Sequence, residues 1–214
     1  MASPAMHLTI ARSLAQTKRI TNTARFTLGQ IYPDLIASCS QNHADSHYKS
    51  TICEGQKKMI DFARFQATYH DKFLSDSFYL GYYLHLVQDA FYRKYLFIDH
   101  GYRVTSKKDT ENLHHDYSIL NEYLVTKYHL DCNLIIPEDI IDLSGVDPLQ
   151  LQDALQRTKD QMNCKPEGEP FFFTKLMADE YIKEAIELCS KEYDAVLSGQ
   201  TYLDPIDFSW NLHA

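Results

Sequence analysis

Apolar residues recur at helical spacing through most of the chain, and this pattern predicts an all-α fold. The pattern predicts helices over approximately residues 6–17, 57–69, 109–129, 147–162 and 171–197. A further apolar helix is expected within residues 71–99, while the apolar stretch 26–34 ends in Pro-Asp, a turn or helix-end signal. Residues 134–142 contain several isoleucines and fit either a short strand or an extended connector. We therefore predict a single-domain helical bundle spanning residues 1–214.

The apolar stretch from Tyr79 to Phe91 is the most informative part of this pattern because it carries His85 and Asp89. Residues four apart lie on one face of a helix, so the imidazole and the carboxylate can reach the same point. A charged aspartate inside an apolar helix is unfavourable unless it is paired or holds a metal ion. Two explanations follow: a bound cation, or a buried His–Asp hydrogen bond that only positions the core.

The composition narrows the range of partners and environments. The formal charge of −8 gives the molecule no general attraction to extended nucleic acid or anionic membranes. Five cysteines without a CxxC spacing predict free thiols in a reducing, cytoplasmic environment. We expect no signal peptide, because the N-terminal residues lack a basic region followed by an apolar core. No apolar run approaches the ~20 residues that span a bilayer, so stable membrane insertion is not expected.

Further candidate metal ligands lie where the expected helices begin or end. They are His7, Asp34, His43 and His47, the last two spaced by four residues. Imidazole and carboxylate donors suit zinc, with iron or manganese as alternatives. One such ion needs about four to six donors, so several separate segments must converge on it.

The order of these residues resembles a known family. His7 is followed by an LGxxxPD turn ending at Asp34, by Ser-His-Tyr around His47, and by an HLxxD helix with His85 and Asp89. Over residues 6–100 this order resembles the zinc-dependent phospholipase C group, whose fold is shared with the S1/P1 nucleases. The resemblance implies an all-α fold with a metal cluster in a cleft between helices.

The resemblance also implies roles for individual residues. The main metal site would be built by Asp34, His47, His85 and Asp89. Asp34 would bridge metals beside the attacking water and act as the general base. Asp89 would bridge to another metal that also takes His7, whereas His43 has no counterpart in the family.

Two departures from the family affect the expected number of metals. Secreted members use a mature N-terminal tryptophan whose amine binds metal, whereas this chain starts Met-Ala-Ser-Pro-Ala-Met, so we expect that ligand to be missing. The family's later HxxxE motif is also absent, and the first histidine after the HLxxD helix is His100. Glu111, His115 and Asp116 are the candidates for completing a second site, and we expect one or two metals.

Two alternatives remain open. The pair His115-Asp116, preceded by His114, resembles HD-domain phosphohydrolases, which are also all-α and metal-dependent, but this resemblance leaves His7 and Asp34 unexplained. The other alternative is a non-enzymatic helical protein with a structural or degenerate metal site. The favoured hypothesis is a metal-dependent hydrolase of a small phosphoester, either a phosphodiester or a phospholipid-like molecule, that uses a metal-activated water and Asp34. The sequence leaves the oligomeric state open.

Overall fold

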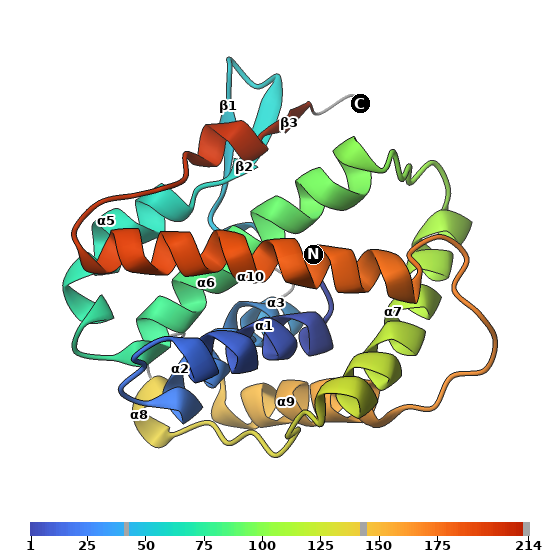
Figure 1. Ribbon diagram of the computed structural model, residues 1–214, viewed down its shortest axis with the longest axis horizontal. Helices are drawn as coiled ribbons and strands as arrows, with labels where there is room; N and C mark the ends of the chain where they lie inside the picture. Colours follow the sequence, from blue (N-terminus) through green and yellow to red (C-terminus); the bar gives the residue numbers. More distant parts are fainter. Residues whose placement is uncertain (41–42, 142–144, 212–214) are drawn as a thin grey trace.

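The structure is a computed structural model that describes residues 1–40, 43–141 and 145–211. It confirms the all-α prediction, with a small sheet at one end (Figure 1). The longer helices are α1 (Pro4–Thr17), α2 (Thr23–Gly29), α3 (Tyr32–Ser40), α5 (Phe62–Phe73), α6 (Ser77–Arg93), α7 (Lys107–Tyr128), α9 (Pro148–Asn163) and α10 (Lys175–Leu197). The shorter ones are α4 (His43–Ser46), α8 (Glu138–Ile141), the π-helix η1 (Lys94–Asp99) and the 3-10 helix η2 (Pro205–Phe208).

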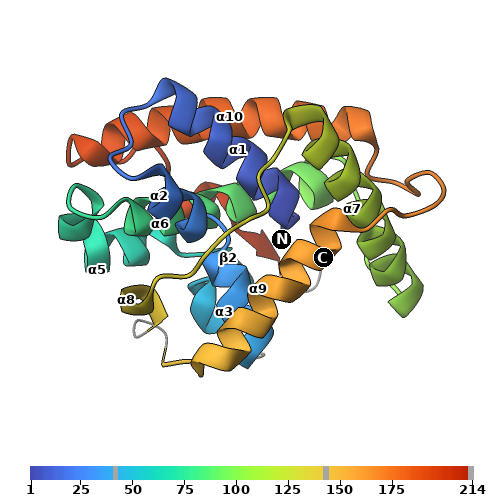
Figure 2. The ribbon, with the colours of Figure 1, turned by 90° about the horizontal axis from the view of Figure 1, so that it is seen from below.

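Helix α6 forms the centre of the molecule. It is buried along almost its whole length, as expected for a helix that is apolar on every face. Helices α2, α5 and α10 pack directly against it. Helix α10 runs beside α1 on one side, and α9 packs against α3 and α7 on the other (Figure 2). No helix within the described residues is both long and apolar enough to cross a bilayer.

Two glycines allow α2 and α6 to touch backbone to backbone. A Cβ atom at Gly81 would overlap the carbonyl oxygen of Phe26 and lie 3.2 Å from the Cα of Gly29. A Cβ atom at Gly29 would in turn overlap the carbonyl oxygen of Phe78 and lie 2.8 Å from the backbone nitrogen of Tyr82. This close approach brings the end of α2 against the N-terminal part of α6.

The predicted helix over residues 57–69 is wrong at its start. Residues 49–60 form a hairpin of β1 (Lys49–Ile52) and β2 (Lys57–Ile60), because three consecutive residues, Cys53, Glu54 and Gly55, have positive φ and reverse the chain. The C-terminal strand β3 (Trp210–Asn211) then pairs with β2, which gives an antiparallel sheet in the order β1-β2-β3. This pairing brings residues near the C-terminus beside the end of α6 (Figure 1).

Two other expectations need correction, and one alternative that the sequence left open is decided. Pro33-Asp34 starts α3 instead of ending a helix, because proline suits a first helical turn, where its missing N–H is not needed. Of the two alternatives for residues 134–142, the extended connector is found over residues 134–137, and residues 138–141 form the short α8; residue 142 lies outside the described residues. The last helix begins at Lys175, not at residue 171, because the backbone N–H groups of residues 171–173 donate to Asp116.

Candidate metal centre

Four acidic and histidine side chains converge beside the middle of α6. They are Asp34, His47, His85 and Asp89, and their ligand atoms all lie within 4.8 Å of one another. Asp34 comes from the first turn of α3 and His47 from the residue after α4. His85 and Asp89 come from successive turns of α6, as the i,i+4 spacing predicted.

The donor atoms point toward a common centre. His47 Nε2 lies 3.2 Å from Asp34 Oδ1 and 3.2 Å from His85 Nε2. Asp89 Oδ2 lies 3.4 Å from His47 Nε2 and 3.5 Å from His85 Nε2. Asp89 Oδ2 is buried, and no group among the described residues hydrogen-bonds to it. Two imidazole nitrogens and two carboxylates sharing a buried point fit the nitrogen and oxygen donor set of a divalent metal such as zinc.

Contacts at Nδ1 of His85 and His47 determine how the Nε2 atoms of the two rings face the centre. His85 Nδ1 lies 2.7 Å from the carbonyl oxygen of Gln30, which only accepts, so Nδ1 carries the proton and Nε2 turns its lone pair to the centre. His47 Nδ1 lies 2.8 Å from the hydroxyl of Ser46. Such outer contacts typically orient metal-binding histidines and set their tautomer.

His7 extends the cluster on the other side of Asp89. Its Nε2 lies 3.5 Å from Asp89 Oδ1, and its ring stacks on that of His85 with centroids 4.1 Å apart. The amide of Gln88 donates to Gln30 Oε1 at 2.7 Å and turns its own Oε1 to His7 Nδ1, also at 2.7 Å. His7 Nε2 is therefore left as a buried acceptor without a partner among the described residues. Asp89 thus faces different imidazoles with its two oxygens, and Oδ1 also accepts the backbone N–H of Ala2 at 2.8 Å.

The electrostatics of the cluster favour a bound cation. Burial, followed by the neighbouring imidazole of His7, lowers the pKa of His85 to about 3, so this ring is neutral at physiological pH. Burial opposes ionisation of Asp34 and Asp89, but the surrounding imidazoles outweigh it and hold both pKa values below their ordinary range. Burial is likewise outweighed at His47, where contacts with both carboxylates raise the pKa of the ring.

Exposure separates Asp34 from the other three residues. Its side chain is 18% exposed, whereas those of His47, His85 and Asp89 are fully buried. Asp34 is therefore the member of this four-residue cluster that solvent reaches.

The structure does not bring the other three sequence candidates to this cluster. Glu111 is exposed and faces Lys107 across one helical turn at 3.7 Å. His115 Nε2 contacts the carbonyl oxygen of Glu167 at 3.2 Å. Asp116 is buried and accepts three backbone N–H groups from residues 171–173, so its carboxylate stabilises the start of the last helix. The converging group found among the described residues includes none of them, which also removes support for the HD-domain alternative.

The remaining histidine candidates have other surroundings. His43 is exposed, with its ring centroid 5.7 Å from that of His47. His100 Nδ1 lies 3.0 Å from the carbonyl oxygen of Tyr95. Gln30 and Gln88, which orient the rings, were not among the candidates from the sequence. A glutamine in an apolar helix next to an aspartate, as at Gln88, was a signal for such a role.

One comparison with known proteins identifies the family. The family model described as zinc-dependent phospholipase C matches residues 6–163, a span that contains the whole cluster from His7 to Asp89. No curated protein and no solved structure matches the chain. The matched span covers well over half of the 214 residues. The chain therefore belongs to the zinc-dependent phospholipase C family, whose members are metal-dependent phosphoric ester hydrolases.

Proposed function

We propose that this protein hydrolyses a phosphodiester at the centre formed by Asp34, His47, His85 and Asp89, with Asp34 as the general base. The convergence of four ligand atoms within 4.8 Å carries this proposal. Membership of the zinc-dependent phospholipase C family supports both the reaction class and zinc as the cofactor.

The chain supplies both the metal ligands and a group that can accept a proton. His47 Nε2, His85 Nε2 and one oxygen each from Asp34 and Asp89 would hold zinc, and His7 with Asp89 Oδ1 would hold a second ion. When bound, such a metal acidifies a coordinated water and stabilises negative charge on phosphoryl oxygens.

Asp34 fits the role of general base on two grounds. Its lowered pKa keeps the carboxylate ionised, so it can accept a hydrogen bond from the attacking water and take up its proton where a bound metal makes that water more acidic. Its side chain is also the one in the four-residue centre that solvent reaches. His47 Nε2 lies 3.2 Å from Asp34 Oδ1, so the two groups would bind the same ion side by side.

Metal analysis combined with a phosphodiesterase assay tests the proposal. The purified protein should contain zinc and hydrolyse bis-p-nitrophenyl phosphate. His85→Ala and Asp89→Ala should lose both metal and activity. Asp34→Asn should reduce turnover by about 10²–10⁴-fold, the usual contribution of a positioned base.

The matched control is His70→Ala, because His70 lies exposed on α5 and outside the cluster. This variant should keep the metal content and rate of the wild type. Metal without turnover would indicate a structural or degenerate site. Full metal content and full rate in His85→Ala would refute the assignment.

A further inference from the structure

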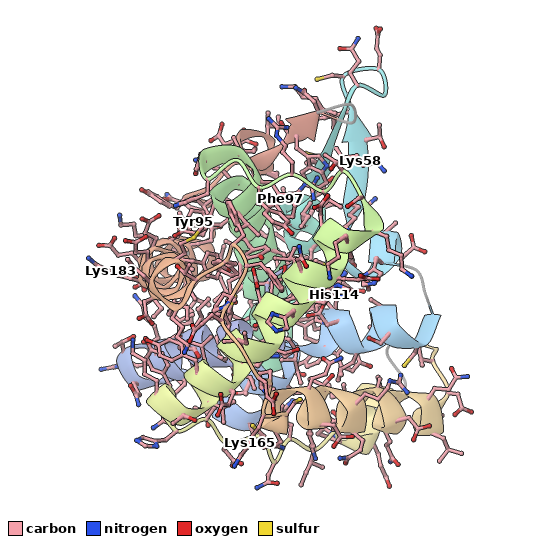
Figure 3. The ribbon with its side chains drawn as sticks, turned by 90° about the vertical axis from the view of Figure 1, so that its right-hand side faces the viewer. Lys58, Tyr95, Phe97, His114, Lys165 and Lys183 are labelled. Atoms are coloured by element: carbon pink, nitrogen blue, oxygen red, sulfur yellow. The ribbon has the colours of Figure 1, made fainter. Side chains whose placement is uncertain are left out.

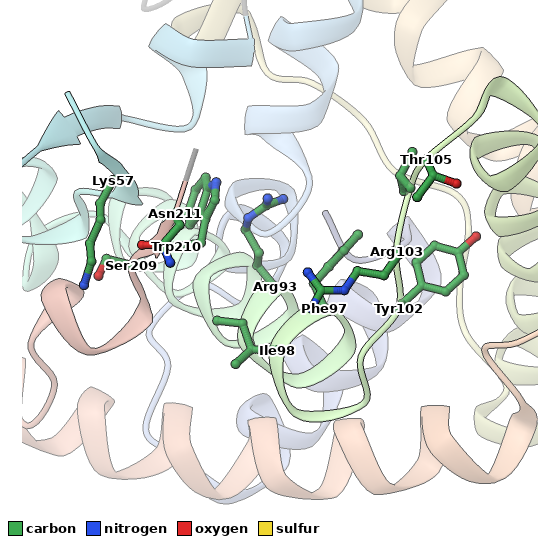
Figure 4. A pocket seen from close by; sticks show the side chains of 11 residues that line it. Lys57, Arg93, Phe97, Ile98, Tyr102, Arg103, Thr105, Ser209, Trp210 and Asn211 are labelled. Carbon is green, nitrogen blue, oxygen red and sulfur yellow. The ribbon is translucent and has the colours of Figure 1, made fainter. Parts of the chain in front are cut away.

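A cavity of about 590 Å³ opens at the end of α6 (Figure 4). Its floor is the π-helix η1, and its walls come from residues 102–105 on one side and from Lys57 and β3 on the other. The volume lies within the range typical of small-molecule sites. A π-helical turn is rare in proteins and is frequently found at functional positions.

The cavity is positively charged although the protein as a whole is acidic. Lys57, Arg93 and Arg103 line it, and no lining residue is acidic. Among the described residues, none of these three cations forms an ion pair. The concentration of unpaired positive charge in one recess of a chain with a formal charge of −8 favours an anionic ligand.

Arg93 is held so that its donors remain available. Its guanidinium stacks over Trp210, at 4.0 Å from the ring centroid, and lies 5.0 Å from the centroid of Phe97. Stacking uses the faces of the guanidinium, whereas its N–H groups point outward in its plane and can bind a phosphate at two points. Arg93 Nε is buried, and the described residues offer it no hydrogen-bond partner.

The cavity adjoins the metal centre through α6. Arg93 follows Asp89 by four residues, so it lies on the same side of the helix and about 6 Å further along the axis. The half-buried Lys49 of β1 has Asp89, Arg93 and Asp34 among its charged neighbours, so positive charge continues from the cavity toward the centre.

We propose that this cavity binds a second phosphate group of the substrate, so that the substrate is a phosphoester carrying a further phosphate. The hydrolytic part of this inference rests on the proposed function, whereas binding of the second phosphate does not. Lys57 and Arg103 attract the group from opposite walls, and Arg93 binds it at the end nearest the metal centre.

Trp210 provides a direct readout because it is the only tryptophan in the chain. Zinc-loaded protein is titrated with alkane bisphosphates of two to six carbons, with the matching alkyl monophosphates and with inorganic phosphate, while tryptophan fluorescence is recorded. At least one bisphosphate should change the emission with an affinity about tenfold or more above that of its monophosphate, since charge-assisted contacts are strong. Arg103→Gln and Lys57→Gln should each reduce this ratio.

Two matched control variants lie away from the cavity. Arg19 is exposed after α1, and Lys183 projects from α10 on a different side of the molecule from Lys58 and Phe97 (Figure 3). Arg19→Gln and Lys183→Gln should leave the binding ratio unchanged. No emission change with any bisphosphate, or an equal response to inorganic phosphate, would overturn the inference.

Steady-state kinetics with two related substrates test whether the cavity contributes to the reaction. Two chromogenic diesters share a p-nitrophenyl leaving group and an alkyl chain, and one of them carries a second phosphate at the end of the chain. The second phosphate should lower KM about tenfold or more and change kcat much less, because it contributes binding away from the reacting atoms. A fluorescence preference for bisphosphates without this KM effect would overturn the substrate assignment. If neither diester is hydrolysed, the proposed function fails, and the fluorescence ratio alone decides whether the cavity binds the second phosphate.

Discussion

The glycine contact between α2 and α6 should be essential for both stability and metal affinity. Gly81→Ala places a methyl group over the carbonyl oxygen of Phe26 and 3.0 Å from its carbonyl carbon. Neither atom can rotate away, because both belong to a helical backbone. The two helices must therefore move apart.

The magnitude follows from two opposing terms. Overpacking typically costs about 1–3 kcal/mol, and we expect the upper part of that range because the overlapping atoms are backbone atoms. The higher helix propensity of alanine stabilises the folded variant by about 1 kcal/mol. The free energy of unfolding should fall by about 2 kcal/mol.

The same displacement should reach the metal centre. Gln30 directly follows Gly29, and its carbonyl oxygen accepts the proton of His85 Nδ1 at 2.7 Å. Lengthening this bond loosens the orientation of the ring, and losing such an outer contact typically costs about 10–100-fold in metal affinity. We expect zinc affinity to fall by about tenfold.

Urea unfolding of the metal-free protein, followed by circular dichroism, measures the stability term, and competition with a chelator measures zinc affinity. Ala67→Gly, at an exposed position of α5, measures the helix-propensity term in the same protein and should cost about 1 kcal/mol. A Gly81→Ala protein as stable as the wild type would show that the two backbones are not in contact and would refute the reasoning.

Three further predictions concern the metal and the neighbouring carboxylate. Chelation should lower the melting temperature, because zinc at 100 times its Kd stabilises a protein that binds it by about 2.7 kcal/mol; an unchanged melting temperature would contradict a folded-state site. Zinc affinity should continue to rise as the pH increases above 6.5, the ordinary pKa of histidine, because the raised pKa of His47 keeps this ring protonated and the metal must displace that proton. Calorimetry in buffers of different ionisation enthalpy should detect the released proton, and the absence of any proton release would contradict the prediction. Asp116→Asn should lower stability by about 1–3 kcal/mol, since buried N–H groups lose a charged acceptor, yet keep full zinc content; loss of zinc from a folded variant would instead make Asp116 a ligand.

The helical part of the fold was predictable because its signals are local. The period of apolar residues located α1, α7 and α9 to within a few residues and placed α6 within residues 71–99. The hairpin over residues 49–60 was missed because it depends on consecutive positive φ values at Cys53 and Glu54, a conformation that neither residue favours by itself. Its third strand comes from residues 210–211, and no local pattern encodes a pairing across such a distance.

The candidate site was also predictable only in part. The four-residue spacing put His85 and Asp89 on one helix face, and the order of motifs pointed to Asp34 and His47; the structure brings these four together. The environment of Asp116 could not be predicted, because its partners lie 55 to 57 residues later in the chain. A carboxylate that binds a metal and one that caps a distant loop look alike in sequence.

The antiparallel pairing of β3 with β2 places Trp210, close to the C-terminus, on the wall of the cavity. The residues matched by the family model end at 163, and Trp210 lies well beyond them, on the wall of the cavity beside Arg93. The cavity is therefore lined both by residues inside the matched span, such as Arg93, and by a residue outside it, whereas the four residues of the metal centre all lie inside that span. Removal of β3 would therefore take away part of one wall of the cavity while Asp34, His47, His85 and Asp89 remain in the chain.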